Sequence, residues 1–372
     1  MDNTSAVGIV HQLLERAIVE RASDIHLEPM DRGVRVRYRI DGILRYVASI
    51  PAWYESRVFT RIKVLAELDI GERRIPQDGK CVFTMLHGVV DVRVATFPST
   101  YGEKIVLRIL DKTYGIKPLE NLGLSDVIVC ALTQIVRRPQ GLFLVTGPTG
   151  SGKTTTLYAI VLELARDEKN VVTLEDPVEY TIPGVTQAHI RPDIGFNFAE
   201  GIRSVLRQDP DIIMVGEIRD AETAYAAIRA ALTGHLVVSS MHTTSAVGAI
   251  TRLLDMGIEP FLLNAVLIGA LAQRLVRVLC QSCKLLVGES LHGMVYEARG
   301  CAVCSHTGYM GRTGIFEYVS CNAAIRAAIS RKAEYEDLRQ MAVAAGMQSL
   351  ADHGQDKVHA GITASQELLR VL

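Results

Sequence analysis

The segment GPTGSGKT at 147–154 places glycines, a lysine and a threonine at the spacing GxxxxGK[ST]. Glycines allow backbone N–H groups to surround a phosphate closely, and the start of a following helix adds attraction for an anion. In such a loop the lysine contacts the β- and γ-phosphates and the threonine hydroxyl is a ligand of Mg²⁺. The predicted nucleotide-binding residues are Gly147, Pro148, Thr149, Gly150, Ser151, Gly152, Lys153 and Thr154, with Thr154 also the predicted magnesium ligand.

Three further polar clusters follow apolar segments of strand type. LEDPVEY (174–180) contributes Glu175, RQDPDIIMVGEIRD (207–220) contributes Glu217, and TGHLVVSSMHT (233–243) contributes His242. A carboxylate near a γ-phosphate and its magnesium can polarise an attacking water molecule. Taken singly, these residues are also consistent with helix-capping carboxylates and a packed histidine. Their coincidence at successive strand ends favours catalysis, because ligands of parallel sheets bind there.

Four of the seven cysteines form two CxxC pairs, separated by the 17 residues 284–300. Two such pairs can present four thiolates tetrahedrally, which suits structural zinc. Unbound thiols and a redox pair are the alternatives. The N-terminal residues MDNTSAVG lack the pattern of a secretory signal, which favours metal over disulfides. The predicted zinc ligands are Cys280, Cys283, Cys301 and Cys304, whereas Cys81, Cys130 and Cys321 are expected to be ordinary packed or surface cysteines.

The phosphate-binding motif and the polar clusters need a scaffold that brings them to one edge. Nearly continuous apolar runs alternate with helical stretches from about residue 119 onward, which predicts a parallel sheet covered by helices on both faces. The motif 147–154 stands between such a strand and a helix, as it requires. The predicted strands are 141–146, 170–175, 211–216 and 235–241.

The N-terminal part has a different pattern, with short alternating segments and turn residues that predict an α+β domain. The expected elements are a helix over 4–20, a strand over 33–41 with a turn at Asp41-Gly42, a helix over about 52–68, a hairpin over 80–97 turning at His87-Gly88, and a strand over 103–110.

The composition is that of an ordinary globular protein. Of 372 residues, 48% are hydrophobic and 22% are charged, which argues against a largely disordered chain. The formal net charge of −1 gives no sign of the basic excess typical of nucleic-acid binding. The longest apolar run, 261–272, is shorter than the roughly 20 residues of a membrane span, so any membrane association is expected to be peripheral.

The four blocks, in this order, resemble the Walker A motif, Asp box, Walker B motif and His box of the secretion ATPases of the type II and type IV pilus superfamily. The resemblance continues outside them and covers nearly the whole chain. It includes RASDIHLEP (21–29), VRYRIDG (36–42), IPQDGK (75–80), STYGEKIVLRILDK (99–112), DMGIEPFLL (255–263), LAQRLVRVLC (271–280) and TGYMGRTGIFEYV (307–319). The segments DMGIEPFLL and LAQRLVRVLC are more similar in sequence to the general secretory pathway E proteins of type II secretion than to pilus extension motors.

This resemblance implies a fold and a domain order. The fold class is α/β, with a RecA-like P-loop NTPase domain preceded by a smaller α+β domain. The implied order is an α+β domain over 1–112, a linker over 113–118, a RecA-like ATPase domain over 119–277, a four-cysteine zinc subdomain over 278–310 and a C-terminal helical subdomain over 311–372.

The resemblance also implies residue roles, with ATP, Mg²⁺ and Zn²⁺ as cofactors. Glu217 is the implied catalytic base, Glu175 with Glu179 arranges magnesium and water, and His242 contacts the γ-phosphate region. Arginines of both domains close around the phosphates. Their matches are Arg93, Arg108, Arg207 and Arg219, each of which could instead form an ordinary surface salt bridge.

The implied machine is a homo-hexameric ring that turns ATP hydrolysis into domain rotation and pseudopilus assembly. It would be cytoplasmic, peripheral on the inner membrane, and would work with inner-membrane platform proteins and no nucleic acid. Family members usually carry a further N-terminal domain, so the chain is either part of a longer protein or a naturally short member. Three alternatives are a type IV pilus extension ATPase, a RecA-like nucleic-acid translocase and a nucleotide-gated scaffold without turnover.

Overall fold

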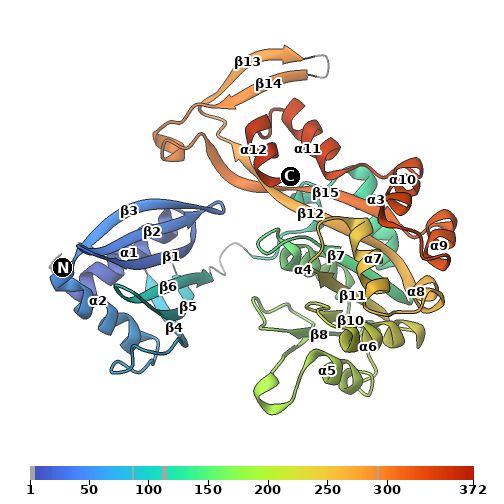
Figure 1. The fold of residues 1–372 in the computed structure, drawn as a ribbon, viewed down its shortest axis with the longest axis horizontal. Helices are drawn as coiled ribbons and strands as arrows, with labels where there is room; N and C mark the ends of the chain where they lie inside the picture. Colours follow the sequence, from blue (N-terminus) through green and yellow to red (C-terminus); the bar gives the residue numbers. More distant parts are fainter. Residues whose placement is uncertain (1–4, 86–87, 111–114, 291–292) are drawn as a thin grey trace. The chain divides into compact units, whose positions relative to one another are not determined.

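The computed structural model describes residues 5–85, 88–110, 115–290 and 293–372. The chain divides into two compact units, Met1–Gly115 and Ile116–Leu372 (Figure 1). Part of the predicted linker 113–118 lies outside the described residues. No helix in these described ranges is long and apolar enough to cross a membrane.

The first unit is a six-stranded antiparallel sheet with two helices, α1 and α2, packed on one face. Alternation explains this arrangement: in β2, Val34, Val36 and Tyr38 face the helices, while the intervening arginines face outward. The Tyr38 hydroxyl donates to the carbonyl of Leu13 in α1 at 2.6 Å. The bounds are α1 Ala6–Val19, β1 Ala22–Met30, β2 Gly33–Ile40, β3 Ile43–Pro51, α2 Ala52–Leu65, β4 Gln77–Met85, β5 Gly88–Ser99 and β6 Gly102–Leu110, in the sheet order β3-β2-β1-β6-β5-β4.

Both predicted turns of this unit join antiparallel strands. Asp41 and Gly42 have φ angles of 49° and 85° between β2 and β3, which a two-residue hairpin turn requires. In the second hairpin Met85 pairs with Gly88, and His87 of the predicted turn lies outside the described residues.

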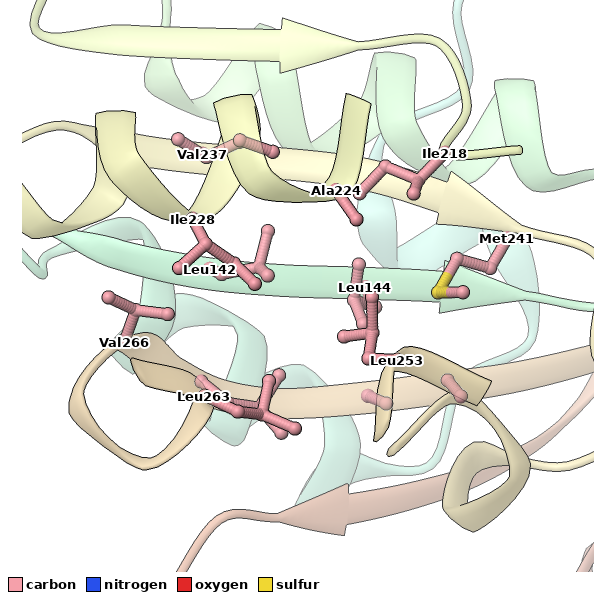
Figure 2. Close-up of a cluster of buried hydrophobic side chains, with 14 of the residues drawn as sticks. Leu142, Leu144, Ile218, Ala224, Ile228, Val237, Met241, Leu253, Leu263 and Val266 are labelled. Carbon is pink, nitrogen blue, oxygen red and sulfur yellow. The ribbon is translucent and has the colours of Figure 1, made fainter. Parts of the chain in front are cut away.

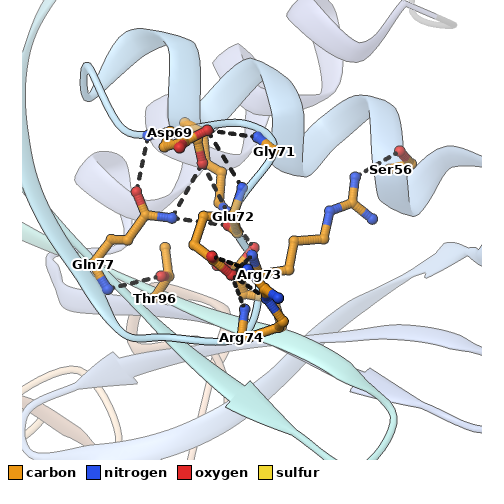
Figure 3. Close-up of polar contacts among 10 residues, drawn as sticks. Ser56, Asp69, Gly71, Glu72, Arg73, Arg74, Gln77 and Thr96 are labelled. Atoms are coloured by element: carbon orange, nitrogen blue, oxygen red, sulfur yellow. Dashed lines mark hydrogen bonds and ion pairs between the residues drawn. The ribbon is translucent and has the colours of Figure 1, made fainter.

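The buried side chain of Lys63 joins α2 to β6 and supports the connection between α2 and β4. Lys63 of α2 lies 2.8 Å from the carboxylate of Glu103, and both side chains are almost fully buried. The Lys63 ammonium also donates to the carbonyls of Asp69 and Glu72. Figure 3 shows Gln77 at the same segment: its side-chain amide donates to these two carbonyls and accepts from the Asp69 N–H.

The second unit contains a seven-stranded sheet in the order β15-β12-β7-β11-β10-β8-β9. Six strands are parallel and β15 pairs antiparallel to β12 at one edge. The predicted parallel sheet is thus present, with β9, β12 and β15 in addition. The bounds are β7 Gly141–Thr146, β8 Val171–Glu175, β9 Thr186–His189, β10 Ile212–Val215, β11 Leu236–Met241, β12 Leu267–Leu279 and β15 Tyr309–Ser320.

Helices cover both faces of this sheet, which explains the unbroken apolar run of β7. Leu142 and Leu144 belong to a core with α6, α7 and α8, whereas Phe143 and Val145 belong to a core with α3 and α4. Figure 2 shows the first core, with Leu142 and Leu144 among side chains of these helices. The bounds are α3 Asp126–Val136, α4 Lys153–Leu164, α5 Phe198–Val205, α6 Ala221–Leu232, α7 Ala246–Asp255 and α8 Pro260–Val266, with 3₁₀ turns at Leu119–Leu122, Pro192–Ile194 and Ala302–Cys304.

The C-terminal part differs from its prediction at one point. The segment 311–372, expected as helical, opens with most of β15, whose Ile315, Phe316 and Val319 are buried in the main sheet. Helices follow from Ala323. A separate hairpin of β13 (Lys284–Ser290) and β14 (Gly293–Ala298) lies between the two cysteine pairs. The helices are α9 Ala323–Ser330, α10 Tyr335–Ala344, α11 Leu350–His359 and α12 Ser365–Val371.

Candidate nucleotide site and cysteine cluster

The segment 147–154, here called the phosphate loop, connects β7 to α4. Gly147, Gly150 and Gly152 have φ angles of 152°, 79° and 89°, a region that favours glycine. At Gly147 a side chain is also excluded by space, since a Cβ atom there would lie 2.6 Å from the carbonyl oxygen of Gln273. The loop conformation therefore depends on the glycines of the motif.

The Lys153 side chain is enclosed by the loop. Its ammonium donates to the carbonyls of Gly147 and Pro148 at 2.9 and 3.1 Å. Burial lowers the pKa of Lys153, with the carboxylate of Glu217 opposing this shift and Arg274 adding to it. The cation thus lies near Glu217, while the neighbouring Thr154 side chain is exposed at the start of α4.

Glu217 follows β10 and is held by two basic side chains. One carboxylate oxygen lies 2.5 Å from Arg219, and the other lies 2.9 Å from Nε2 of His242. Burial by itself would raise the pKa of Glu217, but the hydrogen bonds and charges of Arg219 and His242 outweigh it and lower the pKa. Glu217 is therefore an ionised carboxylate at neutral pH.

Hydroxyl groups fix the strand ends that carry these residues. Ser240 of β11 donates to the carbonyl of Gly216 at 2.6 Å, and the N–H of Ile218 donates to the Ser240 carbonyl at 2.8 Å. Thr146, the last residue of β7, lies 2.6 Å from Thr243, hydroxyl to hydroxyl. The phosphate loop, Glu217 and His242 thus follow β7, β10 and β11, and these hydrogen bonds join the ends of the three strands at one edge of the sheet.

Glu175 occupies a different setting. Its carboxylate is buried and accepts hydrogen bonds from the Tyr158 hydroxyl, from Thr173 at 2.5 Å and from the Gln187 amide at 3.0 Å. Burial and the negative charge of Glu175 raise the pKa of Tyr158, which keeps that hydroxyl protonated as a donor. The Tyr158 oxygen also accepts the N–H of Glu179 at 3.1 Å. Glu175 therefore organises the interior behind the segment 176–180.

The predicted arginines have separate local environments. Arg219 contacts Glu217, as described. Arg207 lies just beyond α5 and donates to the carbonyl of Arg203 at 3.0 Å. In the first unit, Arg93 of β5 is directly opposite Arg108 of β6, and Arg108 donates to Asp24 at 3.0 Å with 62% of its side chain exposed.

Gln273 of β12 is a polar residue of the site to which the sequence interpretation assigned no role. It is 1% exposed and its amide donates to the phosphate loop, while the neighbouring Arg274 donates to the backbone carbonyl of Gln273. The sequence signal for this residue is the pair Gln273-Arg274, which interrupts the otherwise apolar residues 267–276.

The four predicted cysteine ligands converge. Their sulfur atoms lie within 4.8 Å of one another, with separations of 4.0 Å for Cys280–Cys301 and 3.8 Å for both Cys283–Cys304 and Cys301–Cys304. Tetrahedral zinc with Zn–S bonds of about 2.3 Å requires sulfur separations of about 3.8 Å. Two backbone N–H groups also point at the Cys304 sulfur, each at 3.2 Å. The donor set and its dimensions fit zinc.

Comparison with known proteins agrees with this geometry. The family model described as "Type II/IV secretion system protein" matches residues 1–370. The chain is 46% identical to the type II secretion system protein HxcR of Pseudomonas aeruginosa, over all of this chain and 78% of that protein. It is 45% identical to the type II secretion system ATPase E of Vibrio cholerae, over all of this chain and 76% of that protein.

Solved structures show the same fold. The pilus retraction motor PilT with bound ADP is 27% identical, with a TM-score of 0.67 over 97% of this chain and 96% of that chain. The Legionella pneumophila ATPase DotB is 23% identical, with a TM-score of 0.75 over all of this chain and 96% of that chain, a likeness of fold alone. The predicted α/β fold and the prediction of an ATP hydrolase are thereby confirmed. The chain therefore belongs to the type II/IV secretion system protein family, among its type II secretion ATPases.

Proposed function

We propose that this chain is the Mg-ATP-driven motor of a type II protein secretion system. The observation that carries the proposal is the arrangement at one sheet edge of the second unit. A glycine-dependent loop encloses Lys153, and the neighbouring carboxylate of Glu217 is held ionised by Arg219 and His242. A phosphate-binding loop can hold the γ-phosphate, and an oriented carboxylate beside it can activate a water molecule to attack that phosphate.

Each residue of this arrangement has a proposed role. Lys153 and the loop N–H groups bind the β- and γ-phosphates, and Thr154 is a ligand of Mg²⁺, which would neutralise phosphate charge when bound. Glu217 positions and deprotonates the attacking water. His242 and Arg219 orient Glu217 and face the γ-phosphate. Glu175, with Glu179, would help to arrange magnesium and water. Arg207 is a further proposed phosphate contact.

We also propose roles for residues outside the nucleotide site of the second unit. Arg93 and Arg108 of the first unit compensate charge on the same phosphates during transfer. The four cysteines hold one structural zinc ion, in keeping with their spacing and sulfur separations. The chain works as a homo-hexamer at the cytoplasmic face of the inner membrane, bound there through platform proteins of the secretion system.

A type IV pilus assembly ATPase is the second candidate. The Thermus thermophilus type IV pilus assembly ATPase PilB is 43% identical over 99% of this chain, although over only 43% of that protein. Complementation separates the two: the type II proposal expects rescue of protein export in a strain lacking a secretion ATPase. Rescue of pilus extension without export would favour the second candidate.

Phosphate release by the purified chain tests the chemistry. We expect Glu217→Gln to bind Mg-ATP and hydrolyse it at least about 10²-fold more slowly, because an amide cannot accept a proton. Lys153→Ala should lose much of the phosphate affinity itself. Wild-type turnover by Glu217→Gln would contradict the role of Glu217, and unchanged ATP affinity in Lys153→Ala would contradict the nucleotide site.

A further inference from the structure

Strand β12 reaches the phosphate loop because of its register with β7. Ala272 pairs with Thr146, the last residue of β7, so the next residue of β12, Gln273, lies beside the point where the loop begins. The glycine at 147 lets the two backbones approach there, as the position of its missing Cβ shows. The strand is thus placed to support the loop from behind.

The Gln273 side chain is almost fully buried and uses both ends of its amide. Its Nε2 donates to the carbonyl of Ser151 at 2.7 Å, and its Oε1 accepts the hydroxyl of Thr156 at 2.8 Å. One amide therefore bonds the middle of the phosphate loop to the first turn of α4. A buried amide is costly unless it is hydrogen-bonded, and here each end has a partner.

The bond to Ser151 fixes a peptide plane. In a trans peptide the carbonyl and the following N–H point in opposite directions. Because the Ser151 carbonyl points at Gln273, the N–H of Gly152 points away from β12. The left-handed φ of 89° at Gly152 belongs to this orientation of the plane. If the plane turned over, that N–H would leave the side of the loop that faces a bound phosphate.

The geometry points to Gln273 as the positioning residue that holds the Ser151–Gly152 peptide in its phosphate-binding orientation. The inference rests on the proposed nucleotide site and adds a residue to it. Arg274 completes the support. It donates to the Gln273 carbonyl at 2.9 Å and to the Thr244 carbonyl at 2.7 Å, and Thr244 is two residues beyond His242. The pair thus connects the phosphate loop with the segment that carries His242.

The sharpest test is Gln273→Glu, which keeps the shape of the side chain and replaces the donor by a carboxylate oxygen. The carboxylate repels the Ser151 carbonyl and favours the turned peptide, so one N–H bond to phosphate is lost. We expect the Kd for a fluorescent ATP analogue and for ADP to rise about tenfold to a hundredfold, the value of a hydrogen bond to a charged group.

A pH series separates positioning from general damage. As pH falls, the introduced carboxyl group becomes protonated, and its hydroxyl can donate to Ser151 as the amide did. The deficit in affinity relative to the original chain, measured at each pH, should therefore shrink between about pH 8 and pH 6, since burial raises a carboxyl pKa. Gln134→Glu, the same change at an exposed position of α3, is the matched control and should bind normally.

Each outcome decides the inference. Normal affinity of folded Gln273→Glu, or a loss that does not depend on pH, would overturn it. If that variant does not fold, Gln273→Met removes the donor without adding charge, and normal ATP affinity in Gln273→Met would also overturn it. Lys153→Ala in the same assay keeps the two proposals apart: its normal binding would reject the nucleotide site, whereas its failure beside a normal Gln273→Glu would reject only the role of Gln273.

Discussion

Glu217 shows how two neighbours set the state of one carboxylate. Its position past β10 puts it in a half-buried place that disfavours charge, yet Arg219 and His242 keep it ionised. Lys153 could be predicted because the spacing of the loop motif marks it, and Glu217 and His242 could be predicted because they follow apolar strands and match the family's motifs. It assigned nothing to Gln273 or Tyr158, because their partners Ser151 and Glu175 lie 122 and 17 positions away and meet them only in the fold.

At this scale we predict a shift of the pH–rate profile. Removing the charge of Arg219 by Arg219→Gln raises the pKa of Glu217, because Arg219 is the strongest partner that lowers it. Hydrolysis needs the ionised form, so activity is lost as pH falls through that pKa. The acid limb of kcat should therefore move to higher pH, whatever the change in maximal rate. If the acid limb of kcat did not move in Arg219→Gln, it would arise from the titration of a group other than Glu217, and this prediction would be wrong.

Helices and strands were predicted best where the hydrophobic pattern of the sequence is consistent with only one type of element. The parallel strands β7, β8, β10 and β11 have both faces buried, so they are apolar runs that sequence marks well. Strand β1 was missed, because Asp24, His26 and Glu28, which are buried on the face opposite the helices, give it the composition of a loop. Strand β15 was missed because its role depends on pairing with β12, some 40 residues earlier in the sequence.

The buried pair of Lys63 and Glu103 gives a prediction about the first unit. Lys63→Met leaves Glu103 charged without its partner and frees the carbonyls of the segment after α2. We expect a loss of about 3–5 kcal/mol in unfolding free energy, measured by urea denaturation. The exposed Lys80→Met is the control. Lys63→Met combined with Glu103→Leu should recover part of the loss; a double variant no better than the single one would contradict the ion-pair explanation.

The cysteine cluster gives a second prediction for an element. We expect one zinc ion per chain by elemental analysis, and its loss with a lower melting temperature in Cys283→Ser, because binding and local folding are coupled. Cys130→Ser, at an exposed position of α3, should retain both the metal and the melting temperature. Protein purified without chelators and free of zinc would refute the site.

For the whole molecule, the question is whether the first unit takes part in hydrolysis. Arg93 and Arg108 lie side by side on adjacent strands, and Asp24 holds the largely exposed Arg108 by its Nε atom. That arrangement serves either of two purposes, stabilising the sheet or presenting guanidinium groups to a phosphate. A stabilising role and a phosphate-binding role would produce the same local structure. The proposed role of these two arginines therefore comes from the sequence resemblance and not from their local contacts.

The two purposes predict different measurements. If the arginines act on phosphate during transfer, Arg93→Ala and Arg108→Ala should lower kcat at saturating ATP by about 10³ or more, with normal thermal melts. If they serve only as exposed ion pairs, stability should change by about 1 kcal/mol or less and kcat should stay normal. Arg57→Ala on α2 is the control for the same unit. Normal turnover in both arginine variants would exclude the first unit from the chemistry.

The place of β12 in the chain also matters while the protein is being made. The phosphate loop is complete once Thr154 has been added to the chain, but Gln273, which supports the loop, is added 119 residues later (273 − 154). At about 5–20 residues per second, synthesis takes about 6–24 s to cover that interval. During this interval, the nascent chain contains the complete nucleotide-binding motif but lacks Gln273, which supports the phosphate loop in the folded protein. We therefore expect chains stalled before residue 267 to be released from an ATP resin far more readily than chains stalled after the whole sheet has emerged.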